Sequence, residues 1–292
     1  MEFKLLKEMD LTGRVAVITG GGRGIGREIA LAMAECGADI ALAARTEEEL
    51  ESVKQEVIEK GKRCIALRTD VSDSKQVDNL VENTISEFGQ IDIMVNNAGA
   101  LHFLPLVPIP DQVPNPARLS RTPDSRISDD EWQKIMDVNV NGVMYGCRAV
   151  APHMIDRGYG KIINISSSNG AQGVPYCAPY NVSKAAINML TRVLALEWAS
   201  YGITVNGLAP GSFHTEMTNA VWSDAKSVEK HIDAIPVKRG GKLRDLGIFA
   251  AYLASEASDY MTGQVVYILS LIHISAPTRP RLISYAVFCL KK

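Results

Sequence analysis

Short apolar runs rich in β-branched residues alternate along the chain with longer segments in which apolar positions recur every three to four residues. The apolar runs predict strands at residues 15–19, 40–43, 64–67, 91–95, 161–165, 204–207 and 264–268. The other segments predict helices at residues 24–36, 47–60, 74–88, 129–156, 179–200 and 244–254. Apolar strands separated by amphipathic helices are typical of a parallel sheet covered on both faces. The pattern therefore predicts an α/β fold, a single doubly wound sheet of about seven strands, within residues 1–268.

Two segments interrupt this alternation. Residues 101–126 hold six prolines, which exclude a regular helix or a central strand. Because they follow the fourth predicted strand, we expect them beside the ligand cleft, as a lining of the substrate pocket, a subunit contact or a tolerated insertion. Residues 269–292 show neither period, and residues 270–280 read like translated adapter or frameshifted sequence. We expect this tail to be non-native or unstructured.

The composition is that of an ordinary globular protein, with 46% hydrophobic and 22% charged residues. A formal net charge of −2 favours neither a nucleic acid nor an anionic membrane as a partner. No apolar stretch approaches the roughly 18 residues that a membrane span requires. The five cysteines are widely spaced without a CxxC pair, and the five histidines form no cluster with ligand spacing. We therefore expect a soluble cytoplasmic protein with neither disulfides nor a metal.

A glycine-rich run joins the first predicted strand to the first predicted helix. Residues 19–26 read Thr-Gly-Gly-Gly-Arg-Gly-Ile-Gly. Glycines allow a tight turn and a close backbone approach to a pyrophosphate, while the helix N-terminus offers N–H groups and a partial positive charge. A plain strand-to-helix turn would have a similar composition, but the position in the first βα unit favours a dinucleotide site.

The end of the second predicted strand is where dinucleotide folds discriminate between cofactors. An acid there would bind the ribose 2′-hydroxyl, but this chain has Ala44 and Arg45. Arg45 and Arg23 together suit a 2′-phosphate, which predicts NADP(H), with NAD(H) as the alternative. The competing interpretation is that Arg45 is a solvated surface residue and Arg23 merely begins a helix.

Two further strand ends carry candidate cofactor contacts. Asp70 and Val71 follow the third predicted strand and are candidates for contact with adenine, although Asp70 also suits a helix start. Residues 96–99 read Asn-Asn-Ala-Gly after the fourth strand, where Asn97 can bond to neighbouring backbone and Gly99 allows a close approach to a cofactor. An ordinary Asx turn would explain one asparagine better than the whole run.

Tyr180 and Lys184 are four residues apart in a strong helical pattern, so they share one helix face. A free tyrosine has a pKa of about 10, and a nearby ammonium would favour its ionised form. Such a pair on its own usually lies on the protein surface and has no function. Residues 166–168, three serines at the end of the fifth strand, and Asn139 in the preceding helix change that interpretation, because they predict an acid/base site.

Taken in order, these motifs resemble the short-chain dehydrogenase/reductase family over residues 11–268. Residues 19–26 match its TGxxxGxG signature, residues 96–99 its NNAG, residues 180–184 its YxxxK, and Pro210-Gly211 its PG after the sixth strand. The chain departs from the family at two places. It has 39 residues between Gly99 and Asn139, where the family usually has about twenty, and it lacks the Asp-Gly-Gly that normally follows the last strand.

The resemblance implies a Rossmann-type fold and a role for each catalytic residue. Ser167, thirteen positions before Tyr180, would hold the substrate oxygen, and Tyr180 would pass the proton. Lys184 would bond the nicotinamide ribose and lower the pKa of Tyr180. Asn139 resembles the family's asparagine that interrupts its helix and positions a water in the proton relay. Thr215 would touch the nicotinamide carboxamide, unless it is simply a helix N-cap. The predicted cofactor-binding set is Thr19, Gly20, Gly22, Arg23, Gly24, Ile25, Gly26, Arg45, Asp70, Val71, Asn97, Ala98, Gly99, Tyr180, Lys184, Pro210, Gly211 and Thr215.

The leading hypothesis is an oxidoreductase that moves a hydride between NADP(H) and a carbonyl or hydroxyl carbon of a small substrate. Candidate substrates are 3-oxoacyl thioesters, sugars or polyols, and ketones, since a fold does not specify a substrate. The alternatives are a catalytically silent NAD(P)-binding regulatory protein and a nucleotide-sugar epimerase or dehydratase of the family's longer branch. The intact catalytic set argues against the first alternative, and the form of the glycine run against the second. The resemblance also implies a homo-oligomer, a dimer or a tetramer.

Overall fold

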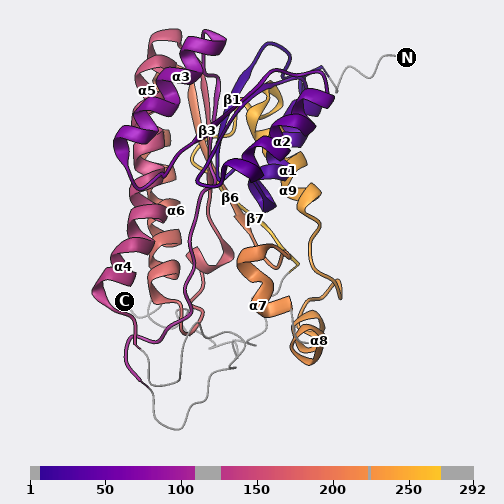
Figure 1. Ribbon diagram of the computed structural model, residues 1–292. Helices are drawn as coiled ribbons and strands as arrows, with labels where there is room; N and C mark the ends of the chain where they lie inside the picture. Colours follow the sequence, from indigo (N-terminus) through magenta and orange to yellow (C-terminus); the bar gives the residue numbers. More distant parts are fainter. Residues whose placement is uncertain (1–6, 109–125, 223–224, 271–292) are drawn as a thin grey trace, which may run out of the picture.

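Seven parallel strands form the sheet at the centre of the computed structural model, which describes residues 7–108, 126–222 and 225–270 (Figure 1). Their order is β3-β2-β1-β4-β5-β6-β7. The strands are β1 (Val15–Thr19), β2 (Asp39–Ala44), β3 (Cys64–Arg68), β4 (Ile93–Asn96), β5 (Gly160–Ile165), β6 (Ile203–Pro210) and β7 (Val265–Ile268). The predicted doubly wound parallel sheet is confirmed.

Helices cover both faces of this sheet, as the apolar strands require. In Figure 1, α1 (Gly24–Glu35), α2 (Glu47–Glu59) and α9 (Leu243–Ala254) lie on one side, and α3 (Ser74–Phe88), α5 (Gly142–Arg157) and α6 (Ala178–Trp198) on the other. Alternate strand residues feed the two cores, because successive side chains point to opposite faces. Ile18 packs into the α1–α9 core and Val17 into the α3–α6 core.

The strand order reverses between β1 and β4, since the chain first builds outward to β3 and then returns to the other side of β1. Such a reversal opens a crevice at the carboxyl ends of the strands, where ligands of open α/β sheets bind. The glycine run after β1, the Asn-Asn-Ala-Gly run after β4 and the serines after β5 all lie at that end. The topology therefore brings the predicted motifs to one edge of the sheet.

The prediction of one continuous helix over residues 129–156 is wrong. α4 (Asp129–Met136) passes into a π-helical turn at Asp137–Asn141 before α5 begins. A π-helical turn widens the helix by one residue, and hydrophobic periodicity hardly registers such a change. The turn is centred on Asn139, whose side chain has functional contacts described below.

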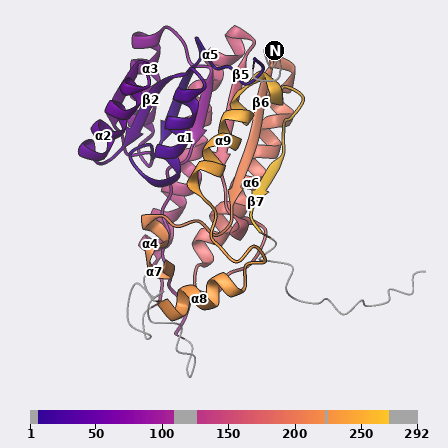
Figure 2. The ribbon, with the colours of Figure 1, turned by 90° about the vertical axis from the view of Figure 1, so that its right-hand side faces the viewer.

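Two helices between β6 and β7 have no counterpart in the sequence prediction. α7 (Asn219–Trp222) and α8 (Ala225–Asp233) lie below the main sheet in Figure 2. α7 is a single turn and α8 is mostly polar, so neither has the long apolar period on which the prediction relied.

The proline-rich segment is described in part. Residues 101–103 form no helix or strand, Leu104 makes an isolated parallel bridge with Cys177, and the Ile127 N–H donates to the Pro105 carbonyl at 2.9 Å. Residues 109–125 of the predicted insertion, and residues 271–292 of the predicted tail, lie outside the described residues. None of the described helices is long and apolar enough to cross a membrane.

Candidate active site

A cavity of about 540 Å³ occupies the carboxyl edge of the sheet. Most of the predicted site residues line it: Gly20, Gly22, Arg23, Gly24, Ile25, Arg45, Asp70, Val71, Asn97, Ala98, Gly99, Ser167, Tyr180, Lys184, Pro210, Gly211 and Thr215. The other three, Thr19, Gly26 and Asn139, are not in its lining but bond to or pack against residues that are. The fold thus gathers motifs separated by nearly 200 residues of sequence around one space.

The glycine turn is shaped by two positions that accept no other residue. Gly20 has a φ of +64°, a conformation that side chains disfavour. A Cβ on Gly26 would overlap the carbonyl oxygen of Gly20 and come within 2.5 Å of Asn97 Nδ2. α1 therefore packs directly on the turn, and its first backbone N–H groups begin at the cavity, the arrangement that suits a phosphate. The cavity beside this turn fits a dinucleotide.

Asn97 and Thr19 lock the ends of β1 and β4 together. Asn97 Nδ2 donates to the carbonyls of Thr19 and Gly20 at 2.9 and 3.0 Å. The Thr19 hydroxyl accepts from the backbone N–H groups of Asn97 and Ala98 at 3.0 and 3.1 Å. These bonds satisfy backbone groups that leave the sheet ladder at this edge. Thr19 and Asn97 therefore hold the backbone of the glycine turn and of the post-β4 segment in position around the cavity.

The polar groups at the β2 and β3 ends are a mixture of charges. Although burial opposes it, hydrogen bonds from Ser72 and the charge of Arg45 lower the pKa of Asp70. Arg23 forms ion pairs with Glu49, at 2.9 Å, and with Glu216. Asp73, rather than Asp70, caps α3 by accepting from the Lys75 N–H. Both predicted arginines therefore line this end of the cavity, and carboxylates line it beside them.

Tyr180 and Lys184 face the same cavity from the first turns of α6. The Lys184 ammonium lies 5.6 Å from the centre of the Tyr180 ring and donates to the carbonyl of Ile165 at 2.7 Å. Lys184 is only 4% exposed, and burial lowers its pKa to about 8. Burial raises the pKa of Tyr180, while a hydrogen bond with Ser167 opposes that shift.

This direction differs from the sequence expectation, in which Lys184 lowers the pKa of Tyr180. The ammonium is buried together with the phenol, so both groups are driven toward their neutral forms by loss of water. A neutral phenol at neutral pH is a proton donor.

The buried ammonium gives a stability prediction. The folded protein releases the Lys184 proton near pH 8 and the unfolded chain near 10.5, so between these values the unfolded chain binds more protons and stability rises with pH. At pH 7 the charge costs about 3 kcal/mol. We expect Lys184→Met to raise the free energy of unfolding at pH 7 by about 2 kcal/mol, since the bond to Ile165 is also lost.

Urea unfolding of both proteins between about pH 7 and pH 10 measures this gain. The difference between variant and parent should shrink as the pH rises above 8, because the parent then loses the buried charge. The exposed Lys75→Met is the matched control and should show no such trend. A gain that stays constant with pH would show that packing, not charge, explains it.

Of the three serines, Ser167 has the position suited to a substrate. Ser166 Oγ donates to Asn188 Oδ1 at 2.5 Å and lies within 3.2 Å of the Lys184 carbonyl, so it is engaged in packing α6 onto β5. Ser167 accepts from the Asn169 N–H at 3.2 Å, bonds to Tyr180 and lines the cavity. Ser168 also lines the cavity, and nothing in its contacts links it to the tyrosine.

Asn139 fixes the chain just beyond Gly99. Its Oδ1 accepts from the Ala100 N–H at 2.7 Å, and its Nδ2 donates to the Ala100 carbonyl at 2.9 Å and to Ser183 Oγ at 3.0 Å. The residue is fully buried. The π-helical turn therefore places the Asn139 amide so that it bonds to the segment after β4 and to α6 at the same time.

The substrate end of the cavity is partly apolar. Leu101 and Phe103, from the start of the proline-rich segment, line it, whereas Leu104 is buried at its bridge with Cys177. Sequence reasoning missed Met217 and His231 in the lining. His231 lies on α8, whose existence was not predicted, and its Nε2 is 3.0 Å from Ser212 Oγ. His102 and His214 do not line the cavity.

Among the described residues, no group of three histidine, cysteine or acidic side chains is placed to hold a metal ion. The four cysteines that the structure describes form no disulfide bond.

Comparison with known proteins identifies this architecture. The family model of the short chain dehydrogenases matches residues 14–226. The 3-oxoacyl-[acyl-carrier-protein] reductase of Staphylococcus epidermidis is 36% identical over 254 residues, 87% of this chain and 96% of that protein. The gluconate 5-dehydrogenase of Gluconobacter oxydans is 35% identical over 265 residues, 91% of this chain and 96% of that protein.

Solved structures agree. A gluconate 5-dehydrogenase from Burkholderia cenocepacia, solved in complex with NADP and tartrate, is 38% identical with a TM-score of 0.81, covering 91% of this chain and 97% of that one. Levodione reductase is 31% identical with a TM-score of 0.78, covering 89% and 97%. The protein belongs to the short-chain dehydrogenase/reductase family, and it is an oxidoreductase that depends on a nicotinamide cofactor.

Proposed function

We propose that the protein transfers a hydride between NADP(H) and the carbonyl or hydroxyl carbon of a small 3-oxoacyl or sugar-acid substrate. The observation that carries this proposal is the convergence of Ser167, Tyr180 and Lys184 at one end of a cavity whose other end is the glycine turn. The relatives named above as a 3-oxoacyl reductase and as gluconate dehydrogenases support the substrate classes. The relative solved with NADP supports the cofactor.

The cofactor is held by the residues around the glycine turn and the strand ends. Backbone N–H groups at the start of α1 bind the pyrophosphate, Arg45 and Arg23 supply positive charge for a 2′-phosphate, and Asp70 and Val71 border the adenine. Gly99 leaves room beside Asn139 and Lys184 for the nicotinamide ribose. When bound, the cofactor supplies the hydride.

The chain itself manages the proton. Ser167 holds the substrate oxygen beside the Tyr180 hydroxyl, and Tyr180 protonates that oxygen as negative charge develops on it. Lys184 orients the ribose and stabilises the phenolate that remains. Asn139, fixed to Ala100, keeps the post-β4 backbone in place and positions the water that returns the proton from solvent.

The decisive experiment measures NADPH oxidation by absorbance with a panel of 3-oxoacyl thioesters, keto sugar acids and simple ketones. The proposal expects turnover on at least one of the first two groups and none without substrate. Binding of NADPH without turnover on any substrate would favour a silent regulatory protein instead. Failure to bind either nicotinamide cofactor would contradict the proposal altogether.

We further propose a cytoplasmic homo-oligomer, in which residues 1–268 form one catalytic domain and residues 269–292 a tail. The widely spaced cysteines support a reducing compartment. The outer face of α6 exposes an apolar stripe, with Val182, Met189, Val193 and Leu196 between 40% and 85% exposed. Such a stripe on a helix of 21 residues suits a second copy of the chain, and sedimentation equilibrium would measure the assembly. The lining by Leu101 and Phe103 supports a role of the proline-rich segment in the substrate pocket.

A further inference from the structure

Glu49 places a carboxylate at the end of the cavity where the proposed cofactor's adenosine ribose would bind. It is the third residue of α2, and it lines the cavity together with Ala44, Arg45 and Thr46 at the end of β2. A Cβ on Gly22 would lie 3.3 Å from Glu49 Oε2, so the carboxylate rests against the glycine turn. The carboxyl end of β2 has no acidic residue, and α2 thus supplies one at the same place.

The carboxylate also holds the arginine that suits a phosphate. Arg23 NH1 lies 2.9 Å from Glu49 Oε1 and forms a second pair with Glu216. The side chains of Arg23 and Glu216 are each 59% exposed, so water and salt screen that second pair strongly. Glu49 is 30% exposed, so more of its charge is felt inside the cavity.

From this arrangement we infer that Glu49 is a cofactor-selectivity residue that weakens binding of the 2′-phosphate and favours the free ribose hydroxyl. This inference rests on the proposed function. A 2′-phosphate brings nearly two negative charges, which the Glu49 carboxylate repels. Glu49 also competes with the phosphate for pairing with Arg23. A ribose hydroxyl, in contrast, can donate to a carboxylate. Glu49 therefore narrows the advantage in affinity that Arg45 and Arg23 give to NADPH over NADH.

The test is fluorescence titration of the full-length protein with NADPH and with NADH, comparing the parent with Glu49→Gln. We expect the ratio of the NADH Kd to the NADPH Kd to rise about fivefold in the variant, the effect of one partly screened charge. The increase should shrink when the salt concentration is raised from about 0.1 M to about 1 M. Glu49→Asp, which keeps the charge, should stay closer to the parent.

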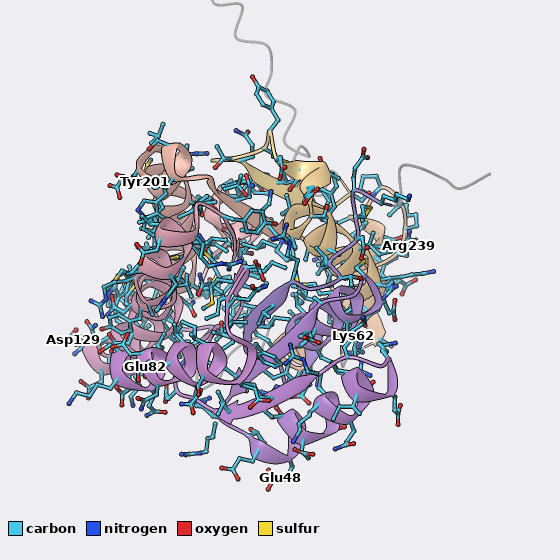
Figure 3. All side chains as sticks on the ribbon, turned by 90° about the horizontal axis from the view of Figure 1, so that it is seen from above. Glu48, Lys62, Glu82, Asp129, Tyr201 and Arg239 are labelled. Atoms are coloured by element: carbon cyan, nitrogen blue, oxygen red, sulfur yellow. The ribbon has the colours of Figure 1, made fainter. Side chains whose placement is uncertain are left out.

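Glu48→Gln is the matched control, because it removes the same charge from the same helical turn. Glu48 is exposed, lies outside the cavity lining and points away from the molecule in Figure 3. Its ratio should equal that of the parent. An unchanged ratio in Glu49→Gln, or an equal shift in Glu48→Gln, overturns the inference. Failure of the parent to bind either cofactor contradicts the proposed function instead.

Discussion

Replacing Tyr180 with phenylalanine should lower kcat about a thousandfold while NADPH binding stays within about twofold of the parent. The variant keeps the ring and loses only the hydroxyl, which bonds to Ser167 and is the proton donor that we propose. Since burial raises the pKa of this phenol, it is neutral at neutral pH and its proton is available for the reducing direction. Steady-state kinetics and cofactor titration on the same preparation measure both quantities.

Tyr201→Phe is the control for this variant, because Tyr201 is 48% exposed and lies at the far end of α6, away from the cavity. It should retain parental kcat. The pH profile is a second readout. We expect the reductase activity of the parent to decline at alkaline pH, where Tyr180 ionises, and we expect loss of the phenol to remove that decline. Retention of more than about a tenth of the parental kcat by Tyr180→Phe would remove Tyr180 from the role of acid.

Replacing Gly26 with alanine should destabilise the fold by about 3 kcal/mol and abolish NADPH binding. The added methyl group would overlap the Gly20 carbonyl and crowd Asn97 Nδ2, both of which are backbone or firmly bonded groups. Relief requires α1 to move away from the glycine turn, which takes its N–H groups from the phosphate position. Thermal or urea unfolding and cofactor titration measure the two losses.

Gly173→Ala provides the comparison, because nothing lies within 4 Å of a Cβ at that exposed position. Its unfolding free energy should be close to that of the parent. If Gly26→Ala were as stable as Gly173→Ala, the close approach of α1 to the turn would be wrong. If it were unstable but bound NADPH normally, the phosphate would lie elsewhere.

The sequence was sufficient for the sheet and for the clustering of motifs, and the physical reason is strong patterning. Most residues of the strands are apolar, and parallel topology places every strand end at one edge. The glycine run, Asn97, Ser167 and the Tyr180 helix therefore had to converge. The apolar period of residues 129–156 does not show the π-helical turn, because the inserted residue leaves that period almost unchanged. Only the family resemblance marked Asn139 as a residue that interrupts its helix.

Electrostatic detail was beyond the sequence because it depends on distances between elements. Arg23 and Glu49 are 26 residues apart, and only the packing of α2 against the glycine turn makes them an ion pair. The direction of the Tyr180 pKa shift follows from how deeply the phenol and the ammonium are buried, which residue spacing does not specify. α8 and its His231 were missed because the helix lacks a long apolar face.

The two-way bond between Asn139 and Ala100 has a further consequence for how such enzymes diversify. Together with the Ile127–Pro105 bond, it ties both ends of the proline-rich stretch to the scaffold, on either side of whatever chain lies between them. Lengthening a tethered stretch costs little, because closure entropy grows only logarithmically with length. We therefore expect that this stretch can be replaced by a loop of another length or sequence while Ser167, Tyr180 and Lys184 keep their positions.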